Sequence, residues 1–286
     1  MFVAPIKLII ENYTQPINIG EFLVRKITTE EQGKFFGITD LRIEGNSTYY
    51  ISLGSRFECE GSLSRTEYSK YITCEYVIET ENIDYIQDFL TYLLFAFRIY
   101  KQGDVYAPMF FHSEYPGFTA IQPYFMNCDK VYTVDDNELG NVEQLFNKIL
   151  EIQSDKRFQL ILDRFNIAIN KNTSKVGGFI DLISILESLL LPPDNGTELS
   201  FKFSLYGSYL LNKLGVNISY KELKELYNDR SKIVHGKLVK DFGNQYDRLY
   251  ELTIILLKEY CNQNIEAKDI EKEIFLTLNI PLTTTR

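Results

Sequence analysis

The sequence contains few histidines and cysteines and no long apolar run. Only two histidines and four cysteines occur among its 286 residues. The cysteines show neither the close pairing of a zinc site nor the density of a disulfide-stabilised fold; they are Cys59, Cys74, Cys128 and Cys261. We therefore expect reduced thiols in a cytoplasmic protein, with no metal and no cofactor.

No segment has the length and composition of a membrane span or a secretion signal. The apolar run at 89–97 ends before Arg98 and is far shorter than the roughly 20 residues that cross a bilayer. Residues 1–7 also lack a basic leader followed by a long apolar segment. The sequence thus predicts no membrane association.

Charge is unevenly distributed along the chain. The net charge of -9 argues against a protein that coats nucleic acid indiscriminately. Residues 200–240 nevertheless hold eight Lys or Arg and three Asp or Glu, a net charge of +5 that leaves -14 for the rest. Their lysines either form a local patch that binds a polyanion or belong to a solvated helix face with ordinary i,i+3 and i,i+4 pairs.

Residues 1–136 are predicted to form a β-rich domain. Stretches 48–53 and 70–79 are rich in the residues typical of strands, and 83–100 has the apolar spacing of a helix that covers one face of a sheet. The tyrosines fit sheet packing better than base stacking, since no basic residues alternate with them. His112 has no ligand residues at metal-site spacing and is interpreted as a packing or surface residue.

From Asp135 and Asp136 onward the pattern predicts helices only, which defines a second domain at 137–286. Candidate helices span 138–152, 155–170, 176–191, 198–213, 219–234, 243–262 and 267–278. Ser219 and Glu222 form a capping-box pattern at the fifth helix, and Gly236 follows its end. The predicted fold class is therefore α+β, a β-rich domain with a covering helix followed by an all-α bundle.

The most distinctive stretch is 226–236, LYNDRSKIVHG, which holds one of the two histidines. Arg230 and His235 lie five residues apart, a rise of roughly 7.5 Å and an offset of roughly 140° on a helix, so they do not share one face. Glu187, among leucines on an earlier helix, either pairs with a cation such as Arg230 or is a surface carboxylate. His235 also has a structural interpretation, in which its imidazole binds a carbonyl of the last turn while Arg230 pairs with Asp229 or Glu187.

Three segments together resemble the Apea-like branch of the HEPN domains: 186–190 (LESLL), 198–205 (ELSFKFSL) and 226–236. Residues 95–105 (FAFRIYKQGDV) are similar in style to the region that precedes this domain. The resemblance, over roughly residues 140–280, implies a HEPN-like helical bundle and a metal-independent endoribonuclease that works as a homodimer. Such proteins are often toxins or anti-phage defence effectors, and some members bind without cutting.

On this resemblance Arg230 and His235 are the catalytic pair, and Ser231 occupies the variable, usually polar position after the arginine. Supporting or RNA-binding roles are expected for Tyr227, Asp229, Lys232, Lys237 and Glu187. The implied partners are an RNA substrate, a second copy of the chain, and an antitoxin or phage-derived trigger. The N-terminal domain would then have a sensing or regulatory role.

The pair also suits RNA cleavage on chemical grounds. Cleavage without a metal needs a base for the 2'-hydroxyl proton, and histidine titrates nearest neutral pH. The charge that develops on the phosphorane needs a fixed cation, and arginine offers a planar fork of donors that stays protonated. Attack by the 2'-oxygen leaves a 2',3'-cyclic phosphate and a 5'-hydroxyl.

Two copies of the motif across a two-fold axis would overcome the angular offset, because they bring two arginines and two histidines to one cleft. The negative end of the helix dipole near His235 favours the protonated form and an acid role for one of the two histidines. The alternative function is a non-catalytic helical module that dimerises and binds nucleic acid, a nucleotide or a partner protein. A metal or cysteine hydrolase has less support, since no ligand cluster or Cys–His arrangement is visible.

Overall fold

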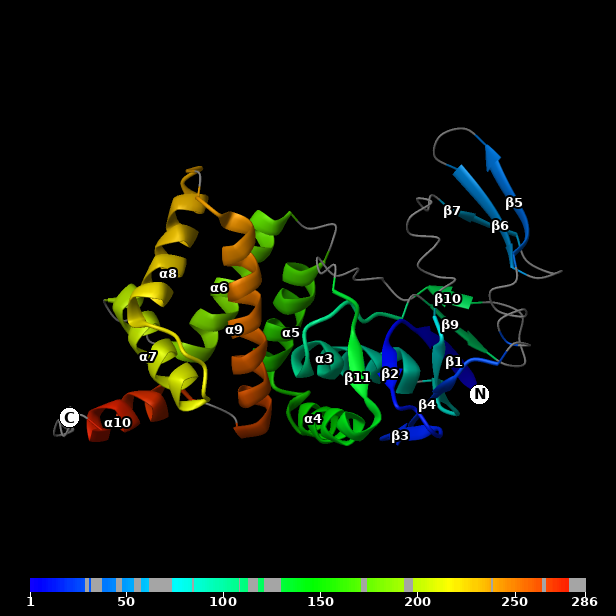
Figure 1. Ribbon diagram of the computed structural model, residues 1–286, viewed down its shortest axis with the longest axis horizontal. Helices are drawn as coiled ribbons and strands as arrows, with labels where there is room; N and C mark the ends of the chain where they lie inside the picture. Colours follow the sequence, from blue (N-terminus) through cyan, green and yellow to red (C-terminus); the bar gives the residue numbers. More distant parts are fainter. Residues whose placement is uncertain are drawn as a thin grey trace. The chain divides into compact units, whose positions relative to one another are not determined.

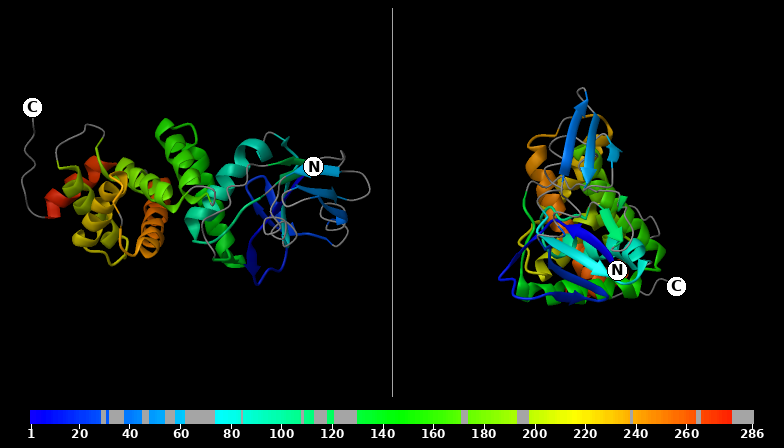
Figure 2. Two further views of the ribbon diagram at one scale, coloured as in Figure 1. Left: turned by 90° about the horizontal axis from the view of Figure 1, so that it is seen from above. Right: turned by 90° about the vertical axis from the view of Figure 1, so that its right-hand side faces the viewer.

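The computed structural model describes residues 1–28, 31, 38–44, 48–53, 58–61, 74–83, 85–107, 109–112, 118–120, 130–170, 174–192, 198–237, 239–263 and 266–277. The chain divides into two compact units, Met1–Asn147 and Lys148–Arg286. Strands and a few helices make up the first unit and helices the second (Figure 1 and Figure 2). The predicted α+β class is confirmed at this level.

The first unit is built on an antiparallel sheet with the strand order β10-β9-β1-β8-β4-β3. These strands are β1 (Phe2–Ile6), β3 (Ile17–Ile19), β4 (Phe22–Lys26), β8 (Tyr76–Thr80), β9 (Met109–His112) and β10 (Phe118–Ala120). Two smaller sheets consist of the parallel pair β2 (Ile9–Glu11) and β11 (Thr133–Asp135), and of the antiparallel β5 (Ile38–Glu44), β6 (Thr48–Leu53) and β7 (Glu58–Gly61). The most N-terminal strand, β1, therefore pairs on both sides, with β8 and β9, inside the sheet.

One of the two predicted strands is confirmed, and the other begins later than predicted. The stretch 48–53 is confirmed as β6. The stretch 70–79 was placed too early, because β8 begins only at Tyr76; Cys74 and Glu75 precede it, and 70–73 lie outside the described residues. His112 ends β9, where it pairs with Phe2 of β1, and its side chain lies outside the described part of the structure.

The predicted helix 83–100 is present in two parts. A π-helical turn, η2 (Tyr85–Phe89), precedes α3 (Leu90–Tyr100). Tyr85 packs its ring against Phe22 of β4, with 4.8 Å between the centroids, so the start of the helix covers one face of the sheet as expected. Arg98 is almost fully buried in α3, where its guanidinium donates hydrogen bonds to the carbonyl of Val105. A charged residue inside this apolar helix is thus accommodated by a backbone acceptor.

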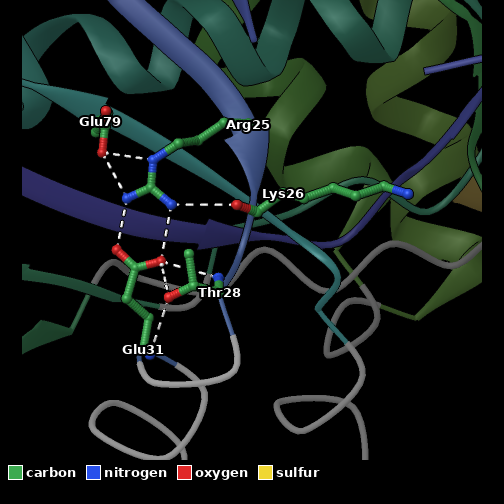
Figure 3. A network of polar contacts seen from close by, with 5 residues as sticks. All are labelled: Arg25, Lys26, Thr28, Glu31 and Glu79. Carbon is green, nitrogen blue, oxygen red and sulfur yellow. Dashed lines mark hydrogen bonds and ion pairs between the residues drawn. The ribbon is translucent and has the colours of Figure 1, made fainter. Parts of the chain in front are cut away.

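A cluster of polar side chains ties the end of β4 to β8 and to Glu31 (Figure 3). Arg25 donates from Nε to Glu79 at 2.9 Å and from Nη1 to Glu31 at 2.7 Å. Glu31 also accepts from the backbone N–H of Thr28 at 2.9 Å. The hydrogen bond from Arg25 is the main cause that lowers the pKa of Glu31 to about 2, so this carboxylate stays ionised and links Arg25 to Thr28.

The predicted domain boundary falls at a well-capped helix start. Asp135 caps the short helix η3 (Asp136–Glu138), which leads into α4 (Leu139–Ile152). The two compact units divide further along, after Asn147 and inside α4. The first part of α4 belongs to the first unit because Phe146 packs against Phe22, with 6.0 Å between the ring centroids.

The second unit contains the remaining helices, and every predicted helix end lies within one residue of the observed one. They are α5 (Lys156–Ile169), α6 (Lys175–Leu190), α7 (Leu199–Lys213), α8 (Tyr220–Val234), α9 (Phe242–Gln263) and α10 (Ala267–Thr277). The largely apolar α6 contacts all five of the others and forms the centre of the bundle (Figure 1). Gly178 allows α5 to approach closely, since an added Cβ would clash with the carbonyl of Ala168. The core of this unit is thus organised around α6.

Within the described ranges, no helix combines the length and the apolar composition that a bilayer crossing requires.

Candidate active site at the C-terminal end of α8

The start of α8 is fixed by a serine cap. Ser219 accepts a hydrogen bond from the backbone N–H of Glu222 at 3.1 Å, as the capping-box pattern predicted. The reciprocal half of that prediction is wrong, because the Glu222 carboxylate accepts a hydrogen bond from Arg248 of α9 at 3.0 Å instead. Glu222 therefore links α8 to α9 rather than closing the first turn of its own helix.

The end of α8 is closed by backbone hydrogen bonds of the Schellman type. Gly236 has φ +69° and donates its N–H to the carbonyl of Ile233 at 2.9 Å. Lys237 donates to the carbonyl of Lys232, also at 2.9 Å. These are the two bonds of this motif, and they require a left-handed residue after the C-cap. The C-cap is His235, so the motif fixes the backbone that carries the candidate catalytic histidine.

We expect Gly236→Ala to destabilise the protein by roughly 1 kcal/mol and to lower the proposed RNA cleavage, because it strains the turn next to His235. An added Cβ at Gly236 meets no atom within 4 Å, so the cost would come from the positive φ alone. Gly243, in the first turn of α9, has equal space and no positive φ. Gly243→Ala is therefore the matched control and should be neutral or slightly stabilising in urea unfolding; equal losses at both sites would contradict this account.

Arg230 is half-buried and faces α6. Its Nη2 lies 3.8 Å from Oε2 of Glu187, which is the pairing that one of the two interpretations predicted. Tyr227 lies one turn earlier on α8; burial first, and then the interaction of its hydroxyl with Glu187, raise the pKa of Tyr227. The Nε of Arg230 is buried and has no hydrogen-bond partner among the described residues. Glu187 thus lies beside both Arg230 and Tyr227, and the Arg230 side chain as a whole remains 34% exposed.

Asp229 does not pair with Arg230, which was the other arrangement considered. Its side chain is almost fully buried and forms an ion pair with Lys232, one turn further along α8. The charge of Lys232 is therefore partly neutralised, although its side chain is about half exposed. Both residues support the structure of the last helical turns, and Lys237 lies beyond them as an exposed cation.

His235 is exposed at the end of α8. Its backbone N–H donates to the carbonyl of Ser231 at 3.2 Å, so the residue is a C-cap through its main chain. The imidazole makes no hydrogen bond to any residue that the structure describes, so the carbonyl contact of the structural interpretation is absent, although its pairing of Arg230 with Glu187 is present. The structure thus leaves the ring nitrogens of His235 accessible.

The structure brings Arg230, Tyr227 and Glu187 together but leaves His235 on another side of α8. At about 100° per residue the two motif residues are roughly 140° apart around the helix. Ser231 lies on the exposed side with His235. From this helix geometry, one chain alone is not expected to present Arg230 and His235 to a single phosphate.

Two aromatic residues near the other end of α8 were not predicted as functional. Phe201 in the first turn of α7 is 47% exposed, and its ring centroid lies 6.1 Å from that of Tyr220. Lys224 extends over the Tyr220 ring, with Nζ 5.6 Å from the centroid. The i,i+4 spacing of Tyr220 and Lys224 was a readable signal for the second contact. The contact with Phe201 joins two helices, and local sequence spacing does not specify it.

The cysteines in the described part of the chain are not suited to nucleophilic catalysis. Cys74 and Cys261 are free and buried, and burial raises the pKa of each thiol to about 12. Cys59 and Cys128 have side chains outside the described residues. Among the residues described, no three His, Cys, Asp or Glu side chains form a group that could hold a metal ion.

Comparisons with protein-family models, with curated proteins and with solved structures gave no match.

Proposed function

We propose that the protein is a metal-independent endoribonuclease of the HEPN type, with a HEPN-like second unit. The observation that carries the proposal is the exposed side chain of His235, fixed on a closed helix end five residues after a partly exposed arginine. The imidazole would take the 2'-hydroxyl proton, and Arg230 would stabilise the phosphorane charge. The products would be a 2',3'-cyclic phosphate and a 5'-hydroxyl.

The proposed active site is completed by a second copy of the chain. Arg230 and His235 diverge around α8, so a two-fold axis beside the end of the helix would let the arginine of one copy act with the histidine of the other. Both residues are at least partly exposed, which such an arrangement requires. The homodimer is thus part of the proposed mechanism.

The proposal extends to the biological setting. A nuclease without a built-in restraint would harm its own cell, which fits a cytoplasmic toxin or anti-phage effector under the control of an antitoxin or a phage-derived trigger. The first unit, with its separate core, would supply the sensing or regulatory part.

Purified protein incubated with total RNA in EDTA tests the proposed reaction. Wild-type protein is expected to cleave RNA under chelation and to leave 2',3'-cyclic phosphate ends, while Arg230→Ala removes the cleavage. Cleavage that needs added metal, or that is the same in both proteins, would contradict the assignment. The chemistry of the ends also identifies a contaminating nuclease that leaves 3'-hydroxyls.

One observation favours a second function. The ion pair of Arg230 with Glu187 gives the arginine a structural role, which a non-catalytic module would also need. In that case the second unit would dimerise and bind nucleic acid, a nucleotide or a partner protein without cutting. RNA binding in the absence of cleavage, unchanged by chelation, would identify this alternative.

A further inference from the structure

One face of α8 connects the Phe201–Tyr220 contact with His235. We define the α8 outer face as Tyr220, Lys224, Asn228, Ser231 and His235. At about 100° per residue these positions fall within roughly 80° of one another around the helix. All are exposed except Tyr220, which is partly exposed. The face therefore runs along one side of the helix for roughly 22 Å, at about 1.5 Å per residue.

The N-terminal end of this face carries a surface suited to stacking. Phe201 is 47% exposed, and the Tyr220 ring supports it from α8 at 6.1 Å between centroids and an interplanar angle of 59°. A ring held in this way loses little conformational entropy when a planar ligand stacks on it. Nucleic acid bases offer such planes, and stacking on aromatic side chains accepts every base.

Charge along the face favours an anionic ligand. Lys224 lies over the Tyr220 ring and forms no ion pair with any described residue. The neighbouring Lys221 is balanced by Glu225 at 3.8 Å, so Lys224 is the cation that a ligand phosphate would neutralise. Asn228 adds an amide further along, on the way to His235. Aromatic, cationic and hydrogen-bonding groups thus follow one another along a helix in a protein of net charge -9.

We propose that the α8 outer face binds a single strand of RNA, with one base stacked on Phe201 and the backbone following α8 to the phosphate that is cleaved at His235. The identity of the ligand as RNA rests on the proposed function. The restriction to single strands comes from Phe201, because a base must be unpaired before it can stack on a side chain. The substrate class is therefore single-stranded RNA or the unpaired loops of a folded RNA, with a binding site for a base away from the cleaved bond.

Binding of a fluorescent 2'-O-methyl RNA, which has no 2'-hydroxyl nucleophile, tests the proposal by anisotropy on the full-length protein. Phe201→Ala is expected to weaken binding roughly 5- to 100-fold, and Phe201→Tyr to retain it. The matched control is Leu160→Ala on α5, which removes another exposed apolar side chain, 55% exposed, and should leave binding unchanged. Lys224→Gln should lower the slope of log K against log salt by about 0.7, whereas Lys156→Gln, at an exposed position of α5, should not.

Any of three binding results would overturn the proposal. In the first, Phe201→Ala binds the RNA with wild-type affinity while its thermal unfolding is unchanged. In the second, the protein binds a duplex of the same sequence as tightly as the single strand, and in the third it binds an acidic peptide of equal charge equally well. Cleavage in EDTA is measured in parallel. If Phe201→Ala cleaves RNA at the wild-type rate, the proposed nuclease activity stands and the proposed stacking site is excluded. If RNA binding depends on Phe201 but no RNA is cleaved, the stacking site stands and the proposed nuclease activity is excluded.

Discussion

Replacement of His235 by alanine is expected to lower RNA cleavage by roughly 10²- to 10⁴-fold, the range of general acid–base catalysis, while the fold remains intact. The imidazole is exposed and bonds to no described residue, so its loss should change the free energy of unfolding by less than about 0.5 kcal/mol. The turn itself is held by main-chain bonds, which alanine preserves. Cleavage rates and urea unfolding of the same preparation measure both quantities.

Chemical rescue makes this prediction specific. Because the side chain of His235 is open to solvent, imidazole from the buffer should reach the site in His235→Ala and restore part of the cleavage. The rescued rate should rise with the fraction of neutral imidazole in the buffer if this histidine acts as the base. A mutant with the wild-type rate would exclude His235 from catalysis, and a loss accompanied by unfolding would show a structural role.

The sequence predicts structure that depends on neighbouring residues better than structure that depends on residues far apart in the chain. The helices of the second unit were predicted within one residue at each end because caps such as Ser219 and stop signals such as Gly236 act on neighbouring backbone groups. For the first unit, the sequence predicted strands but not the order in which they pair. Its order joins β1 to β8 and β9 across long stretches of chain, and no local pattern specifies such partners.

In the candidate site, too, spacing within one helix was predictable, whereas contacts between helices were not. The helical spacing predicted that Arg230 and His235 do not share a face, and in the structure Arg230 pairs with Glu187 of α6 while His235 is exposed. Whether Glu187 paired with Arg230 or remained a surface carboxylate was open in the sequence, because the answer depends on how α6 packs against α8. The stacking of Phe201 on Tyr220 depends in the same way on α7 and α8. Side chains that meet across helices are thus the part of the site that spacing does not reveal.

The Glu187–Arg230 pair can be measured separately from catalysis. Glu187→Lys would place two cations side by side and remove the partner of Arg230, so a loss of roughly 1 kcal/mol in the free energy of unfolding is expected. Asp163→Lys reverses an exposed carboxylate on α5 for which no ion pair is seen in the described structure, and it serves as the control. Unchanged stability and unchanged cleavage in Glu187→Lys would show that the Glu187–Arg230 pair contributes to neither.

Replacement of Arg230 by lysine separates its two roles and is expected to lower cleavage by roughly 10²- to 10³-fold with little change in stability. Lysine keeps a positive charge that can pair with Glu187, and such partly exposed pairs contribute only about 1 kcal/mol or less. It lacks the planar fork of donors that arginine presents to a phosphate.

A purely structural arginine would give the opposite result, because Arg230→Lys would then retain cleavage wherever it retains stability. Arg230→Met is the matched variant, since it keeps an apolar stem of similar shape and removes the charge. It should lose both cleavage and some stability, and adding Glu187→Gln should recover the stability by removing the unpaired carboxylate. Cleavage should remain lost in that double variant if Arg230 acts, as proposed, on the phosphorane charge and not only on Glu187.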